Sequence, residues 1–226
     1  MIPTAAIVLS LLGLLLQAAF ILVEHKKNYV SAVILKGSAS LVFVTIGIIG
    51  FMNCSNTPFG RMVLLGLIFG AMGDILLNLR YLSEKNGQKI FLAGIAVFLT
   101  GHIMYLLALI PLSDNLIISF IAGAACAAIL LAYIFHRMKI KLAFKLFGVF
   151  YIGAIVVMTA VAMGNLISAW ENTRLLFAAG AVLFTVSDVV LIFNTFGDKT
   201  TFSKRIINLS CYYIGQLLIA YAVFFS

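Results

Sequence analysis

Eight apolar runs follow one another through the chain, with only short polar connections between them. They cover approximately residues 4–23, 30–51, 61–79, 89–110, 116–135, 142–163, 173–193 and 204–225. A helix needs about 20 apolar residues to cross the hydrocarbon core of a bilayer, and a helix satisfies its own backbone hydrogen bonds there. The pattern therefore predicts an all-α polytopic membrane protein, an eight-helix transmembrane bundle.

The composition supports a single membrane domain over residues 1–226. Hydrophobic residues make up 64% of the chain and charged residues 10%, whereas a soluble domain is about half apolar and a quarter charged. No Pro/Gly/Ser-rich linker or low-complexity segment divides the sequence. The first run, Ile7 to Val23, has no basic segment before it and no clear cleavage site after it, so we interpret it as a retained helix and not a signal peptide.

The basic residues predict an orientation. Twelve of the fifteen Lys and Arg residues flank the connections after the first, third, fifth and seventh runs: Lys26, Lys27, Arg80, Lys85, Lys89, Arg137, Lys139, Lys141, Lys145, Lys199, Lys204 and Arg205. Arg61 and Arg174 lie on the other side, and Lys36 lies within a span. Cytoplasmic connections carry such an excess. We expect the cell (inner) membrane, both termini on its non-cytoplasmic side, and basic residues that contact anionic lipid, with no nucleic acid as partner.

An offset of 114 residues aligns the chain with itself. It pairs Gly66 with Gly180, Asp74 with Asp188, and Gly101-His102 with Gly215-Gln216. The offset spans four helices, so it predicts two parallel four-helix repeats, roughly residues 1–112 and 113–226. Chance similarity between Leu/Ile/Val-rich helices remains the alternative.

Polar residues gather at one depth of the predicted bundle. At 1.5 Å per residue, Asp74 and Asp188 each lie ~9 Å inside the basic edge. Lys36, Tyr212, Gln216 and His102 lie in the same half or near the bilayer centre. A charge in hydrocarbon costs at least ~2.5 kcal/mol, so we expect these groups to face one another or a wet cavity.

Helical spacing supports one facing pocket. Asp74 and Asn78 are four residues apart, as are Tyr212 and Gln216, so each pair shares a helix face. Lys36 and one aspartate could instead form only a structural ion pair. His102, Tyr151, Tyr212 and Gln216 could serve packing or interhelical hydrogen bonding, and Lys204 and Arg205 could serve topology alone. However, two aspartates face a single intramembrane lysine, so one carboxylate lacks an obvious counter-charge.

Two buried carboxylates suit acid–base chemistry when one holds a proton and the other is ionised. Such a pair could hydrolyse an acid-labile ether or acetal through an oxocarbenium ion, or could relay protons in a carrier. The histidines are scattered, the cysteines form no CxxC pair, and neither a zinc signature nor a GxSxG motif is present. From the residues alone, an intramembrane hydrolase and a carrier are equally good hypotheses for the function.

Four ordered motifs add a resemblance. GDILLN at 73–78, GHIMY at 101–105, FTVSDVVLIFN at 184–194 and YYIGQ at 212–216, with Lys36 early in the second run, resemble the YhhN family of membrane lysoplasmalogenases. The resemblance implies hydrolysis of the vinyl ether bond of lysoplasmalogen to a fatty aldehyde and a glycerophospho-ethanolamine or -choline. It places the family's two motif aspartates, proposed as the catalytic pair, on Asp74 and Asp188. Gly37 stands here where the family pattern has proline after the lysine.

The chemistry and the resemblance together assign roles. We expect one aspartate to donate the proton and the other to act as base or cation stabiliser. We expect Lys36 to hold the phosphate with Tyr212 and Arg80, and the alkenyl chain to extend toward the outer half. The residues expected to position the water and the ether oxygen are Asn78, His102, Tyr151 and Gln216. No metal or cofactor is expected, and the expected partners are a lysophospholipid substrate and membrane lipids.

Two other functions remain open on the sequence. One is a proton-coupled transporter or flippase of a small amine or lipid, and the weaker one is a non-catalytic lipid-binding scaffold. A carrier is expected to break helices at mid-depth, whereas the three prolines, Pro3, Pro58 and Pro111, all lie at helix ends. Their positions favour the enzyme.

Overall fold

The computed structural model describes residues 2–138 and 142–226, and eight long helices account for most of them. These are α1 (Thr4–His25), α2 (Tyr29–Asn53), α3 (Thr57–Leu79), α4 (Gly87–Leu109), α5 (Leu116–Arg137), α6 (Leu142–Ser168), α7 (Asn172–Phe196) and α8 (Phe202–Ala222). Three short 3-10 turns, η1 (Arg80–Leu82), η2 (Ile110–Leu112) and η3 (Val223–Phe225), follow α3, α4 and α8. All eight long helices are long and apolar enough to cross a membrane, which confirms the all-α membrane prediction.

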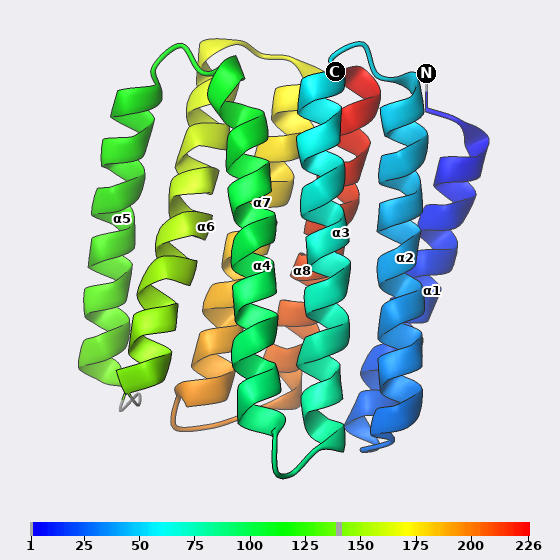
Figure 1. The fold of residues 1–226 in the computed structure, drawn as a ribbon, viewed down its shortest axis with the longest axis vertical. Helices are drawn as coiled ribbons and strands as arrows, with labels where there is room; N and C mark the ends of the chain where they lie inside the picture. The colour runs from blue at the N-terminus through cyan, green and yellow to red at the C-terminus, as the bar shows by residue number, and fades with distance from the viewer. Residues whose placement is uncertain (1, 139–141) are drawn as a thin grey trace.

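The helices run side by side and alternate in direction (Figure 1). Both termini lie at one end of the bundle. The connections after α1, α3 and α7 and the end of α5 lie at the other end, which we call the basic end. Of the twelve basic residues assigned to that end, Lys139 and Lys141 lie outside the described residues. Which end faces the cytoplasm remains a prediction from the charge distribution.

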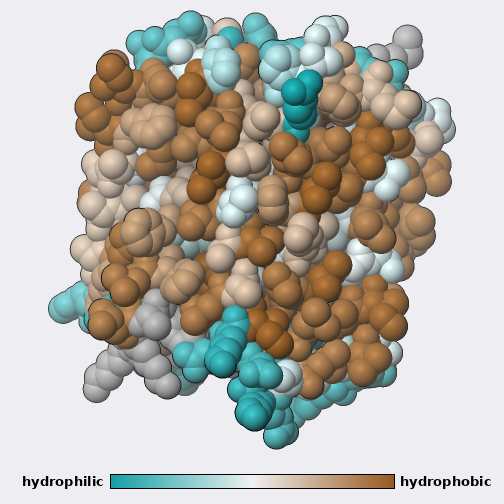
Figure 2. Space-filling model, in the orientation of Figure 1, coloured by the Kyte–Doolittle hydropathy of each residue, from teal (hydrophilic) through white to brown (hydrophobic). Residues whose placement is uncertain are grey.

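The outer surface of the bundle is suited to lipid. Figure 2 shows a broad apolar belt between two hydrophilic ends. Large apolar side chains such as Leu15, Ile34 and Ile117 are exposed on it. A soluble protein rarely exposes so continuous an apolar surface, so the belt corresponds to the hydrocarbon region.

Side-chain and backbone caps define the helix ends at the basic end. The Asn28 side chain accepts a hydrogen bond from the Ser31 amide at the start of α2, which satisfies an unpaired helical N–H group. At the end of α1, Lys27 N–H donates to the Glu24 carbonyl and Asn28 N–H donates to the Val23 carbonyl. This is the Schellman pattern, whose left-handed residue is usually glycine; here it is Lys27, with φ 61°.

Two close helix crossings position the aspartates. A Cβ on Gly101 would lie 3.2 Å from the Gly66 carbonyl, where α4 crosses α3. A Cβ on Gly215 would lie 2.8 Å from the Gly180 carbonyl, where α8 crosses α7. Glycine allows such backbone approach between membrane helices. The two crossings are related by the 114-residue offset, as are Asp74 on α3 and Asp188 on α7; an ancestral repeat remains a prediction.

Candidate functional site

Both aspartates line one small cavity inside the basic half of the bundle, which we call the inner cavity. Its volume is about 50 Å³, which is room for a few water molecules. Seven of the nine predicted site residues line it: Lys36, Asp74, Asn78, Arg80, Tyr151, Asp188 and Tyr212. The other two, His102 and Gln216, are buried behind this lining.

Asp74 is held by three donors that converge on one oxygen. Its Oδ2 accepts hydrogen bonds from Ser40 Oγ at 2.5 Å and from the Tyr212 hydroxyl at 2.8 Å. Lys36 Nζ lies 3.3 Å from the same oxygen, and the Lys36 side chain is only 1% exposed. Three donors, one of them a cation, stabilise an ionised carboxylate.

Lys36 directs two of its three N–H donors to partners within the protein. Besides Asp74, its ammonium donates to Gln17 Oε1 at 3.2 Å and lies 4.4 Å from the centre of the Tyr212 ring. Gln17 is itself fixed, because its Nε2 donates to the Leu209 carbonyl at 3.1 Å. The ion-pair alternative considered from the sequence therefore describes the geometry of Lys36.

Asp188 has a different environment. The Tyr151 hydroxyl of α6 donates a short hydrogen bond to Asp188 Oδ2. No Lys, Arg or His of the described residues forms an ion pair with Asp188. A carboxylate without a counter-charge is costly to bury, and the neutral acid is the favoured form. The two aspartates thus share a cavity but differ in charge compensation.

Gln216 acts on Asp74 through Tyr212. Gln216 Nε2 donates to the Tyr212 hydroxyl at 3.2 Å, and Gln216 Oε1 accepts from the Tyr105 hydroxyl at 2.6 Å. Because the Tyr212 oxygen accepts from Gln216, its hydroxyl hydrogen is donated to Asp74. The structure thus places Gln216 as a residue that orients Tyr212, and not as one that lines the inner cavity.

His102 packs behind Tyr151. Its Nδ1 lies 2.6 Å from the Phe98 carbonyl; because a carbonyl only accepts, Nδ1 carries a hydrogen. Nε2 is buried and has no partner among the described residues. The imidazole ring lies edge to face against Tyr151, with ring centres 5.3 Å apart. The arrangement fits a neutral imidazole that supports Tyr151.

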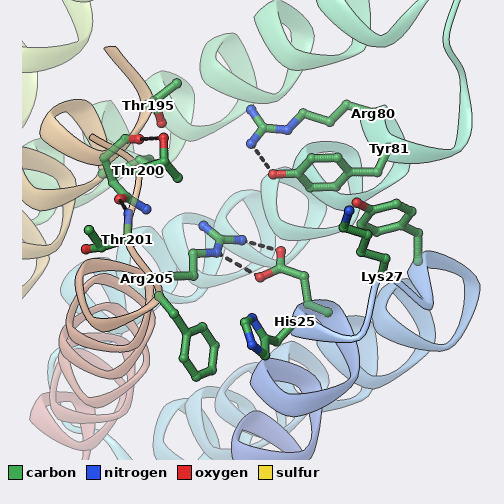
Figure 3. Close-up of a pocket in the computed structure, with 13 residues that line it drawn as sticks. His25, Lys27, Arg80, Tyr81, Thr195, Thr200, Thr201 and Arg205 are labelled. Atoms are coloured by element: carbon green, nitrogen blue, oxygen red, sulfur yellow. Dashed lines mark hydrogen bonds and ion pairs between the residues drawn. The ribbon is translucent and has the colours of Figure 1, made fainter. Parts of the chain in front are cut away.

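A larger cavity of about 430 Å³ opens at the basic end, and we call it the vestibule (Figure 3). It shares Arg80, Leu191 and Arg205 with the inner cavity, so the two adjoin. Arg205 is paired with Glu24 through Nε at 2.8 Å and Nη2 at 2.5 Å. The sequence interpretation of Arg205 as a topology determinant missed this contact.

An apolar slot of about 70 Å³ leads sideways from the inner cavity. Asp188 and Tyr151 line both spaces, and the rest of the slot is apolar apart from Thr195: Leu77, Phe91, Ile95, Phe98, Gly148, Ile152, Leu191, Ile192 and Phe196. Most of these residues lie between the aspartates and the basic end, whereas Phe98 and Ile152 lie at the depth of the aspartates. The expected route for a hydrocarbon chain, toward the outer half, is therefore not the route of this slot.

Asn78 lines the inner cavity and is hydrogen-bonded to the backbone of Asp74. Its Nδ2 donates to the Asp74 carbonyl at 2.9 Å, while its Oδ1 is buried without a partner among the described residues. An unpaired acceptor at the cavity wall is free to accept from a water molecule. For metals, no group of three or more His, Cys, Asp or Glu side chains within residues 2–138 and 142–226 could hold an ion.

Gln17 and Glu24 are the contributors that the sequence analysis missed, and both come from α1. Gln17 is a single amide within an otherwise apolar run, and an amide in hydrocarbon needs a partner, so its position was a usable signal. Glu24 gave no such signal, because a charged residue at a helix end is ordinary.

Comparison with known proteins places this chain in a family. The sequence model of the YhhN family matches residues 31–223. The chain belongs to the YhhN family. Lysoplasmalogenase TMEM86A of Bos taurus is 29% identical over 170 residues, which cover 72% of this chain and 65% of the relative. Lysoplasmalogenase TMEM86A of Homo sapiens matches with the same identity and coverage. The chain thus matches about 65% of the length of these relatives, and no solved structure matches it significantly.

The YhhN match begins after α1. Thr4–His25 precedes residue 31, so Gln17 and Glu24 reach the site from outside the matched region. All nine predicted site residues lie inside it.

Proposed function

We propose that this YhhN protein is an intramembrane lysoplasmalogenase that cleaves the vinyl ether bond by aspartate acid–base catalysis. The observation that carries the proposal is that Asp74 and Asp188 line one water-sized cavity, while only Asp74 has a cationic partner. A protonated and an ionised carboxyl group are the pair that vinyl ether hydrolysis requires. The names of the TMEM86A relatives supply the substrate class.

The first step uses Asp188 as the acid. Its proton passes to the β-carbon of the vinyl ether, and the double-bond electrons form that C–H bond. The product is an oxocarbenium ion, R–CH2–CH=O⁺–R′, and an Asp188 carboxylate. The ionised Asp74 stabilises the cation, since opposite charges attract strongly away from bulk water. Tyr151 holds one Asp188 oxygen and so fixes the direction of transfer.

The second step consumes one water molecule. Water attacks the cationic carbon, and Asp74 accepts the proton that the water loses, which gives a hemiacetal. Asp188 then takes the hemiacetal O–H proton while Asp74 returns its proton to the departing glycerol oxygen. The products are a fatty aldehyde and glycerophospho-ethanolamine or -choline, and both aspartates regain their starting states.

The remaining residues position these groups. Lys36 keeps Asp74 ionised, and Tyr212, oriented by Gln216, holds the same oxygen. Asn78 Oδ1 orients the attacking water, and His102 supports the ring of Tyr151. The apolar slot receives the alkenyl chain, because its lining adjoins Asp188.

The carrier alternative receives less support from the helices. A carrier of this size is expected to bind its substrate at discontinuous helices. Within the described residues, each spanning helix is continuous through the depth of both aspartates. Rigid elements of this kind suit a catalytic pair that must keep its geometry.

The test is incubation of the purified protein in detergent with a lysoplasmalogen. The matched control is the ester lysophospholipid with the same headgroup and chain length. We expect aldehyde release from the vinyl ether and no fatty acid release from the ester. An intact vinyl ether after incubation across pH 5–8 would refute the hydrolase proposal and favour a carrier.

A further inference from the structure

The vestibule holds two cations that no carboxylate neutralises. Its charged lining residues are Glu24, Lys27, Arg80 and Arg205. Arg205 and Glu24 form a bidentate pair that cancels both charges. No described residue forms an ion pair with Arg80 or Lys27. The cavity therefore offers a net positive charge to a ligand.

Arg80 is oriented for a ligand without being saturated by the protein. Its guanidinium carbon lies 4.6 Å from the centre of the Tyr81 ring and 4.4 Å from that of Phe91. Its Nη2 donates to the Tyr81 hydroxyl at 2.6 Å, while no described residue accepts a hydrogen bond from its Nη1. Stacking on rings fixes the guanidinium plane and leaves donors free, which is the arrangement suited to phosphate.

Lys27 keeps its side chain in the vestibule at a conformational cost. It occupies the left-handed position of the Schellman turn, φ 61°, where glycine is the favoured residue. Its side chain is exposed and lines the same cavity as Arg80. In the view of Figure 3, Arg80, Tyr81 and Lys27 lie on one side of the cavity and Thr195, Thr200 and Thr201 lie on the other.

The depth of the vestibule indicates which kind of phosphate its two cations would bind. Its walls come from the ends of α1 and α7, the starts of α2 and α8, the connections between them, and η1, which is the level of lipid headgroups. We infer that Arg80 and Lys27 form a phosphate-binding subsite for the phosphodiester of a lysophospholipid whose glycerol reaches into the inner cavity. The inference rests on the proposed function for its substrate. It keeps Arg80, which the sequence already assigned to the phosphate, and replaces Lys36 and Tyr212 with Lys27 in the vestibule.

A binding experiment with lipids that cannot react tests the subsite. The probes are a saturated 1-alkyl ether glycerophosphoethanolamine and the 1-alkyl glycerol of the same chain length, titrated into the full-length protein in a maltoside detergent. We expect wild type to bind the phospholipid at least about tenfold more tightly, because only this probe can accept charge-assisted hydrogen bonds from the subsite. Arg80→Gln should abolish that preference, and Arg80→Lys should retain part of it.

The control variant is Arg137→Gln, because Arg137 lies exposed at the same end of the bundle, on α5. It should bind both lipids as wild type does. Equal preference for the phospholipid in Arg80→Gln and wild type would overturn the subsite. Displacement of the phospholipid by equimolar inorganic phosphate would identify a free-phosphate site instead, and would overturn the headgroup assignment.

Lys27 allows a second test that does not depend on Arg80. Lys27→Gly should raise the thermal midpoint, by about 2–4 °C for a chain of this size, while lowering affinity for the phospholipid severalfold. Lys27→Ala should lower the affinity equally without the gain in stability. A stabilised Lys27→Gly protein with unchanged phospholipid affinity would remove Lys27 from the subsite.

These outcomes separate the subsite from the hydrolase. Neither probe contains a vinyl ether, so binding is measured whether or not turnover occurs. A phosphate-dependent preference without aldehyde release would keep the subsite and reject the hydrolase. Aldehyde release with no phosphate-dependent preference would keep the hydrolase and reject the subsite.

Discussion

The two aspartates are chemically identical residues in unlike surroundings. Asp74 has Lys36, Ser40 and Tyr212 on one oxygen, whereas Asp188 has two neutral partners, the hydroxyls of Tyr151 and Ser187, and no cation among the described residues. Only Asp74 thus has a cationic partner, and this difference supports the proposal that Asp188 is the acid and Asp74 the base.

Replacing either carboxyl group should stop the reaction. Asp74→Asn and Asp188→Asn should each reduce aldehyde release by at least about 10²–10⁴-fold, the usual contribution of proton-transfer catalysis. The double variant should be little worse than either single one, because residues that act as a unit are strongly non-additive. Steady-state turnover of lysoplasmalogen measures this, and near-normal turnover in either single variant would exclude the paired mechanism.

The same two substitutions should differ in their effect on stability. Asp74→Asn leaves the Lys36 ammonium buried without a counter-charge, which typically costs about 3–5 kcal/mol. Asp188→Asn exchanges one neutral group for another of the same size and should leave the melting temperature nearly unchanged. Thermal unfolding in detergent makes the comparison. A larger loss for Asp188→Asn would mean that the charge assignment is reversed.

The loss in Asp74→Asn should be recoverable if its cause is the stranded cation. Lys36→Met removes the ammonium and keeps most of the side-chain volume. The double variant Lys36→Met/Asp74→Asn should therefore be more stable than Asp74→Asn alone, with a coupling energy of about 0.5–3 kcal/mol. If the losses of stability from Lys36→Met and Asp74→Asn were additive, the Lys36–Asp74 ion pair would not contribute to the stability of the protein.

At the scale of the helices, the sequence predicted the features that hydrophobicity and periodicity determine, namely the spans and the residues that share a helix face. The eight spans agree with the observed helices to within about five residues at each end, because apolar length is a strong constraint in a membrane. The shared faces of Asp74 with Asn78, and of Tyr212 with Gln216, also followed from spacing within one helix. All four side chains are buried in the bundle.

Contacts between helices could not be predicted in the same way. Tyr151 meets Asp188 across α6 and α7, and Gln17 meets Lys36 across α1 and α2. Such pairings depend on the rotation and depth of each helix, which small residues at the crossings set. The sequence therefore gave the candidate residues but not which aspartate is paired with the lysine.

The crossing of α7 and α8 should be sensitive to a single methyl group. A Cβ at Gly215 would lie 2.8 Å from the Gly180 carbonyl, so Gly215→Ala should force the helices apart and displace Tyr212 from Asp74. We expect lower thermal stability and a fall in turnover, since small misplacements at an active site can cost about 10²-fold. Gly153→Ala is the matched control, because a Cβ there meets nothing within 4 Å. Equal behaviour of the two variants would refute the packing argument.

For the whole molecule, the site lies toward one face of the membrane. The vestibule, the inner cavity and the apolar slot all lie in the basic half of the bundle. A lysophospholipid has a headgroup at the interface and one chain in the hydrocarbon, and the three spaces have the same order. Such a protein should draw its substrate from the leaflet at its basic end, and this leaflet depends on orientation.

The excess of basic residues predicts that this leaflet is the cytoplasmic one. An epitope tag after Ser226 should be accessible to antibody or protease from outside intact cells, or from the lumen of an internal membrane. A tag inserted between Ser83 and Asn86, in the connection from η1 to α4, should be protected until the membrane is permeabilised. The two tags lie at opposite ends of the bundle, so each serves as the control for the other. Protection of the C-terminal tag together with exposure of the loop tag would show that the orientation is the reverse of the predicted one. The lysophospholipid would then come from the outer leaflet, while the proposed chemistry of the aspartates would be unaltered.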